Sequence, residues 1–190
     1  MRVRYEVDSG ERVEELCMRL LRRYGIPEGI VRHSAKVAEV SRFIAKGLIE
    51  RGERVDLDKL TIGALLHDIG KSTLYVRGNA RNHAEASAEI VRREGLPDVA
   101  QIVSRHILDS IISSVDFPRG WEEKIVFYAD KVVARELVSV DERFAELQRR
   151  RPDIRDLLEA SFAPTKALES EILQAAGLTW RDLVTHLGRS

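Results

Sequence analysis

The chain has 190 residues, of which 44% are hydrophobic and 33% charged, and its 31 Lys and Arg residues are balanced by 31 Asp and Glu. This length allows one compact domain with a sizeable core, and the absence of net charge argues against a general attraction to nucleic acid or acidic membranes. The single cysteine, Cys17, excludes a disulfide framework and a cysteine-rich zinc site. With no evident signal peptide or long apolar stretch, we expect a cytoplasmic protein.

In chain order, the alternating hydrophobicity of residues 1–10 predicts a short extended arm. Beyond it, apolar residues recur at helical spacing, and Gly and Pro divide the pattern into separate helices. The expected helices cover residues 11–24, 28–51, 57–66, 83–94, 97–112 and 121–138. Two to four more are expected in residues 140–190, broken at Pro152, Pro164 and Gly177. Because no strand pattern follows the arm, the sequence predicts an all-α fold.

The third expected helix ends with an imidazole next to a carboxylate, in the run Leu65-Leu66-His67-Asp68-Ile69-Gly70-Lys71. Neutral imidazole and carboxylate together are the ligand types that first-row transition metals prefer. An isolated pair of this kind serves equally well as a polar cap at the end of a helix. The choice between the two interpretations therefore depends on the rest of the chain.

Other candidate ligands lie on separate helices. His33, His83 and His106 fall at positions where helices can bring them to the His-Asp pair, although each alone is typical of a capping or half-buried histidine. Asp130 lies in a helix that is apolar on nearly every side, where an unpaired carboxylate would be costly to bury. An arginine or a metal ion would satisfy that carboxylate. Asp109, one turn after His106, is a candidate to orient that imidazole.

The order His33, His67-Asp68 and Asp130 resembles the HD-domain superfamily of metal-dependent phosphohydrolases over roughly residues 28–140. This resemblance implies that those four residues bind a first metal. It also implies that His83, His106 and the shared Asp68 bind a second, a layout similar to the bacterial diadenosine tetraphosphate hydrolases. The HD-GYP phosphodiesterases share the first half of the pattern, but this chain has neither their adjacent histidine pair nor their GYP segment.

The chemistry of such a site is coherent. Two cations can clamp a phosphate group and lower the pKa of a bound water, so that the protein need not supply a nucleophile. Mixed imidazole and carboxylate ligands suit Fe, Mn, Co, Ni or Zn, and we expect one or two such divalent ions as cofactors. Within this scheme Asp68 and Lys71 are the predicted catalytic residues.

Positive side chains near the pair are candidates to hold the phosphate. Lys71 lies about one turn beyond Asp68 and can reach a phosphate oxygen, unless it is an ordinary solvated lysine. Arg77 and Arg81 occupy an irregular loop between two expected ligands. Arg105 and Arg135 are further candidates, since a guanidinium group binds phosphate well.

These observations predict a metal-dependent phosphohydrolase that cleaves a phosphate ester or anhydride by a metal-activated water. The resemblance implies a nucleotide substrate, with a dinucleoside polyphosphate as a more specific alternative. An inactive HD domain that senses a nucleotide or binds a partner is the competing hypothesis. We expect an N-terminal arm and helix in 1–27, the metal-binding core in 28–140 and helices packed on it in 141–190. No nucleic-acid or membrane partner is expected, and a homodimer is compatible with the sequence.

Overall fold

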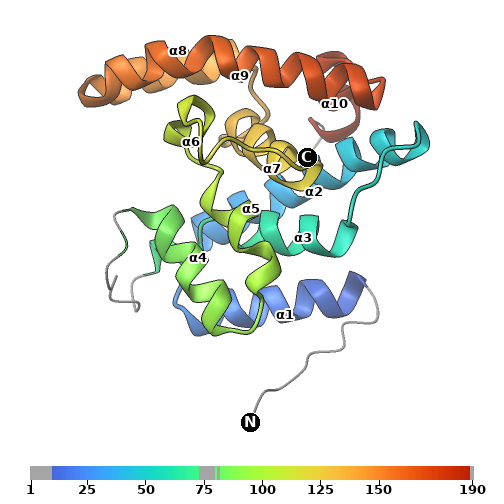
Figure 1. Cartoon of the computed structure of the whole chain (residues 1–190), viewed down its shortest axis with the longest axis vertical. Helices are drawn as coiled ribbons and strands as arrows, with labels where there is room; N and C mark the ends of the chain where they lie inside the picture. Colours follow the sequence, from blue (N-terminus) through green and yellow to red (C-terminus); the bar gives the residue numbers. More distant parts are fainter. Residues whose placement is uncertain (1–9, 73–79, 81, 189–190) are drawn as a thin grey trace.

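The computed structural model describes residues 10–72, 80 and 82–188, and every regular element in this part of the chain is a helix (Figure 1). The α-helices are α1 (Gly10–Arg23), α2 (Glu28–Glu50), α3 (Leu57–Leu66), α4 (His83–Arg93), α5 (Ala100–Ser104), α6 (Leu108–Ile112), α7 (Trp121–Val132), α8 (Val140–Arg150), α9 (Arg155–Ala176) and α10 (Trp180–Leu187). Three short 3-10 turns are η1 (Ile69–Lys71), η2 (Pro97–Val99) and η3 (Pro152–Ile154). The all-α prediction is confirmed. The arm expected in residues 1–10 lies almost entirely outside the described residues.

Helix α3 is the central element, packed against α1, α2, α5 and α7. Its residues 60–66 are all buried, which explains why this segment is apolar on every side. The side chain of Asp56 caps the helix by accepting a hydrogen bond from the backbone N–H of Lys59 at 3.0 Å. Because the helix points into the core, its last turn carries His67 and Asp68 into the interior, where both are almost fully buried.

Helices α8, α9 and α10 form a layer at one end of the molecule, and α1 lies at the opposite end (Figure 1). Helix α9 packs on α2, α6 and α7. The hydroxyl of Tyr128 on α7 donates a buried hydrogen bond of 3.1 Å to Glu169 on α9. The C-terminal layer therefore packs directly on the two helices that carry His33 and Asp130.

Two of the expected helices are shorter than their apolar pattern. The segment 97–112 divides into η2, α5 and α6, because the backbone leaves the helix around His106 and is extended at Ile107. Helix α7 stops at Val132, where the predicted helix continued to Val138. There the chain turns back, with a bridge between Val133 and Leu137. Periodicity failed at both points because β-branched and apolar residues fit a buried turn as well as a helix.

The prediction of a helix break at Pro164 is wrong, since this residue lies inside α9. A proline in a helix leaves one carbonyl of the preceding turn without its N–H partner. Here nearby hydroxyl groups bond to carbonyls of that region: Ser161 Oγ donates to Leu157 O at 2.6 Å and Thr165 Oγ1 to Ser161 O at 2.8 Å. Gly177 does end the helix, in the left-handed conformation with φ +65°.

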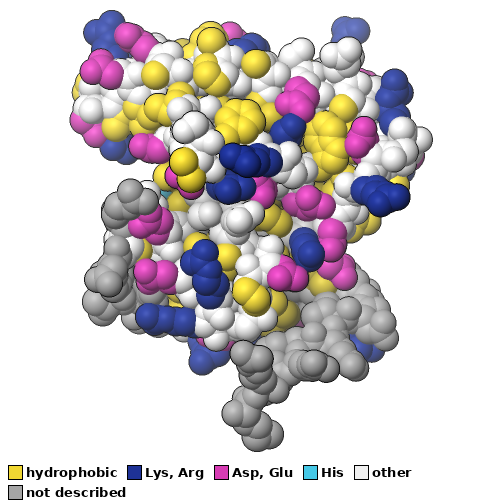
Figure 2. Space-filling model, viewed as in Figure 1, with side chains coloured by type: hydrophobic (Ala, Val, Ile, Leu, Met, Phe, Trp, Pro, Cys, Tyr) yellow, Lys and Arg dark blue, Asp and Glu magenta, His cyan; other side chains and the backbone are white. Residues whose placement is uncertain are grey.

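The surface shows the mixed charge that the composition predicts. On the face shown in Figure 2, basic and acidic side chains are interspersed, and apolar side chains are most prominent on the C-terminal layer. No helix within the described residues is long and apolar enough to cross a membrane.

Candidate metal centre

The site is built on the junction between α3 and η1. His67 directly follows the last residue of α3 as its C-cap, and its Nδ1 lies 2.8 Å from the carbonyl oxygen of Ala64. A carbonyl can only accept, so this hydrogen bond assigns a proton to Nδ1. Nε2 of His67 is then directed at the neighbouring carboxylates, 3.4 Å from Asp68 Oδ2 and 3.5 Å from Asp130 Oδ1.

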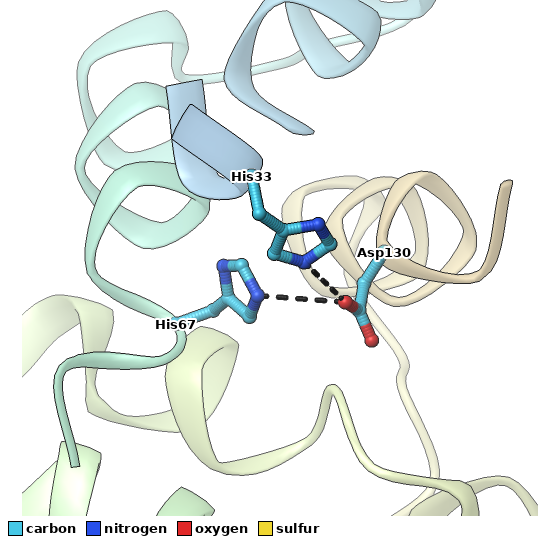
Figure 3. Close-up of side chains that lie close together, drawn as sticks. All are labelled: His33, His67 and Asp130. Atoms are coloured by element: carbon cyan, nitrogen blue, oxygen red, sulfur yellow. Dashed lines mark hydrogen bonds and ion pairs between the residues drawn. The ribbon is translucent and has the colours of Figure 1, made fainter. Parts of the chain in front are cut away.

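A first cluster joins His33 of α2, His67 and Asp130 of α7, whose potential ligand atoms all lie within 4.8 Å of one another. Figure 3 shows both imidazole rings directed at the same carboxylate. Nε2 of His33 lies 2.9 Å from Asp130 Oδ1. Three helices that are distant in sequence thus supply one group of donors.

A second cluster joins His67, Asp68 and His106, again with potential ligand atoms within 4.8 Å. His83 extends it, since its Nε2 lies 3.1 Å from His106 Nε2 and 3.4 Å from Asp68 Oδ1. Nδ1 of His106 lies 2.7 Å from Val103 O. The carbonyl of Val103 thus orients this ring, the role for which Asp109 was the candidate. The structure therefore gathers all six residues that the sequence predicted as ligands.

The position of His83 depends on close packing between η1 and the first turn of α4. The backbone N–H of Gly70 donates to Ser87 Oγ at 2.9 Å, and that hydroxyl lies 2.7 Å from His67 O. A Cβ atom on Gly70 would lie only 2.0 Å from the carbonyl oxygen of His83, so the glycine is required for this approach. Asn82 caps α4 by accepting from Glu85 N at 3.0 Å.

Two lysines contact the acidic ligands. Nζ of Lys71 lies 2.6 Å from Asp68 Oδ2, with 40% of the side chain exposed. Nζ of Lys131 is buried, 2.5 Å from Asp130 Oδ2 and 2.7 Å from His106 O. Sequence reasoning missed Lys131, although a lysine next to Asp130 in an otherwise apolar helix was a usable signal.

At both buried acids of the site, neighbouring positive charge outweighs the effect of burial on the pKa. Burial alone would raise the pKa of both carboxyls, but His67 beside Asp68 and Lys131 beside Asp130 hold them well below the ordinary value. Burial would lower the pKa of His67, yet Asp68 and Asp130 raise it to about 10. By contrast, burial and then the neighbouring His106 lower the pKa of His83 to about 3, which keeps this ring neutral.

Two buried atoms of the site have no hydrogen-bond partner among the described residues: Nε2 of His67 and Oδ1 of Asp68. A buried polar atom without a partner costs about 1–3 kcal/mol. Imidazole nitrogen and carboxylate oxygen are also the donors that suit a divalent transition metal. The residues present therefore fit a metal site of the expected type.

The clusters open onto a cavity of about 610 Å³. Its wall includes Lys71 and, from the C-terminal layer and its connecting segment, Arg143, Arg151, Ile154 and Leu157. The C-terminal helices thus contribute directly to the cavity. Sequence reasoning missed both of these arginines, because nothing in their local pattern separates them from the many surface arginines of the chain.

The other predicted phosphate contacts have different outcomes. Arg105 donates to Glu123 at 2.8 Å and is not among the residues that line the cavity, so the geometry does not favour it as a substrate contact. Arg77 and Arg81 lie outside the described residues. Lys71 lines the cavity beside Asp68, and its contact with a phosphate stays a prediction.

The all-helical fold and the clustered His and Asp residues are those of an HD domain, and the chain belongs to this family: the HD domain match covers residues 30–156. The matched region contains all six clustered residues, and it extends into the C-terminal layer through α8 and η3.

Among its relatives is the tRNA (cytidine(56)-2'-O)-methyltransferase of Thermoplasma volcanium, 35% identical over 68% of this chain and 40% of that protein. An uncharacterized protein of Methanocaldococcus jannaschii is 30% identical over 65% of this chain and 78% of its own length. The dihydroneopterin 2',3'-cyclic phosphate phosphodiesterase of the same organism is 31% identical over 66% of this chain and 54% of the enzyme. The chain thus spans only 40% and 54% of the two named enzymes among these three relatives. No solved structure matches.

Proposed function

We propose that this protein hydrolyses a phosphodiester bond in a small nucleotide-like phosphate ester. Two groups of side chains would hold one or two divalent transition-metal ions: His33, His67, Asp68 and Asp130 for the first, and Asp68, His83 and His106 for the second. The observation that carries the proposal is a pair of buried metal-ligand atoms that make no hydrogen bond within the described residues, Nε2 of His67 and Oδ1 of Asp68. Asp68 also lines the cavity, together with Lys71.

When bound, the divalent cations would neutralise phosphate charge and lower the pKa of a bound water. The backbone carbonyls of Ala64 and Val103 hold the rings of His67 and His106 with Nε2 toward the site. Asp68 belongs to both groups, since Oδ2 faces His67 and Oδ1 faces His83 and His106. Lys71 lies half exposed at the cavity wall, where its ammonium group could bind a phosphate oxygen of the substrate instead of Asp68.

Two observations favour a small diester. One relative is named as a phosphodiesterase of a 2',3'-cyclic phosphate. The cavity volume of about 610 Å³ also falls within the range of about 300–1,000 Å³ found for small-molecule sites. Hydrolysis of a dinucleoside polyphosphate stays a more specific prediction. The alternative of an inactive sensor is less well supported, because all six expected ligands lie close together and Lys71 lies beside them.

The test begins with metal analysis of protein purified without chelator. Turnover of 2',3'-cyclic nucleotides, bis(p-nitrophenyl) phosphate and p-nitrophenyl phosphate is then measured after loading with manganese, iron or nickel. We expect bound metal and a preference for the diesters. Asp68→Asn should lose metal and reduce turnover by at least about 100-fold, because it removes a ligand shared by both groups. Asp109→Asn removes a carboxylate from the same cavity without touching either cluster, and should retain metal. Full metal content and turnover in Asp68→Asn would refute the proposal.

A further inference from the structure

A second cavity of about 610 Å³ adjoins the one that holds the metal centre. It is formed by the turn that follows α7 and by one face of α8. Its charged lining residues are Arg135, Glu136, Arg143, Glu146 and Arg150. His33 and Arg143 line both cavities, so the two cavities adjoin at these two side chains. Of the two, His33 also belongs to the first cluster of the metal centre.

The second cavity has an excess of positive charge, because three arginines face two glutamates. On α8, Glu146 accepts hydrogen bonds from Arg143 Nη1 at 3.0 Å and from Arg150 Nη1 at 2.9 Å. Hydrogen bonds from Arg150 and then Arg143 lower the pKa of Glu146 and keep it ionised. One carboxylate thus holds two guanidinium groups on the same face of the helix, each with further N–H donors to offer.

One donor in this wall lacks an acceptor. Nε of Arg143 is buried and has no hydrogen-bond partner among the described residues, although the residue pairs with Glu146 through Nη1. Arg135 lines the same cavity from the turn that follows α7, is exposed, and has no carboxylate within ion-pair range in the described part of the chain. Guanidinium groups bind phosphate oxygens through several N–H donors at once.

We propose that the second cavity is an anion subsite that binds another phosphate group of the substrate. The substrate class is then a nucleotide-like phosphate ester with two phosphate groups. One phosphate would lie at the metal centre, and the other would lie beyond His33, among Arg135, Arg143 and Arg150. This inference rests on the proposed function for the identity of the first phosphate. The subsite itself depends only on the residues of the second cavity.

Binding tests the subsite independently of turnover. Calorimetry of the protein as purified compares adenosine 3',5'-bisphosphate with adenosine 5'-monophosphate. We expect the bisphosphate to bind at least about tenfold more tightly, the gain from one charge-assisted hydrogen bond. The double variant Arg135→Met/Arg150→Met should bring the two affinities together. Arg149→Met, on the same helix but outside this cavity, should retain the preference for the bisphosphate.

Turnover then links the subsite to the reaction. Adenosine 2',3'-cyclic phosphate is compared with the same compound bearing a 5'-phosphate, and the preference should appear in KM and fall toward unity in the double variant. Equal affinity of the wild-type protein for mono- and bisphosphate, or a preference that survives the double variant, overturns the subsite. A binding preference without turnover of either compound overturns the proposed function and leaves the subsite standing.

Discussion

Gly70 permits the closest backbone approach at the metal centre, and its replacement by alanine should separate the two clusters. A Cβ at this position would lie 2.0 Å from His83 O, 2.6 Å from Ser87 N and 2.9 Å from Ala86 Cβ. Real Cβ atoms essentially never approach other heavy atoms within 3.0 Å, so the first turn of α4 must move by about 1 Å or more. The neighbouring atoms are mainly backbone, and no side-chain rotation can relieve the contact.

Overpacking of this kind costs about 1–3 kcal/mol of stability. A misplacement of about 1 Å at a reacting centre can lower the rate by about 100-fold. His83 should move away from Asp68 and His106, while His33, His67 and Asp130 keep their places on α2, α3 and α7. We therefore expect Gly70→Ala to lose about half of the metal bound by a two-ion protein and to lose about 100-fold in kcat.

Metal analysis, turnover and urea denaturation check this prediction. Gly29→Ala is the stability control, because a Cβ there meets nothing within 4 Å and an alanine favours the helix. Gly70→Ala with wild-type metal content and turnover would refute the argument that contact with η1 positions His83. If Gly70→Ala does not fold, Ser87→Ala tests the same argument, because it weakens the contact between η1 and α4 without introducing a clash.

Three further predictions concern the supporting residues and the ions. Ser87→Ala leaves the backbone N–H of Gly70 and the carbonyl of His67 without their buried hydrogen-bond partner. The free energy of unfolding, measured in urea, should therefore fall by about 1–3 kcal/mol. The control Ser104→Ala removes an exposed hydrogen bond on α5 and should have little effect. Lys131→Met removes the cation beside Asp130 and should destabilise the metal-free protein by about 3 kcal/mol. Unchanged stability would show that the neighbouring histidines alone balance the negative charge of Asp130. Removal of metal with a chelator should lower Tm by about 5–10 °C if the ions were present at about 100 times Kd, and an unchanged Tm would mean that no ion was bound.

The sequence predicted most of the helices, because apolar periodicity is a strong local signal. The apolar run that ends at His67 and Asp68, and the cost of burying an unpaired Asp130, also pointed to side chains that the structure brings together. That these side chains bind metal stays a prediction. Two ends were misplaced, at His106 and Val132, where a buried turn has the same apolar composition as a helix. Arg143 and Arg151 could not be found, since their place at the cavity follows from how α8 and the segment after it pack on α7 and α9, and not from their neighbours in the chain.

The packing of the helices gives the two metal clusters different supports. His33 and Asp130 stand on α2 and α7, which α9 covers, whereas α4, the helix of His83, packs on η1, η2 and α5. His67 belongs to both clusters and links the two halves of the site. A change in α9 should therefore disturb the cluster of His33 and Asp130 first, and a change in α4 should first disturb the position of His83. This division allows one cluster to be altered by substitutions while the packing beneath the other stays intact.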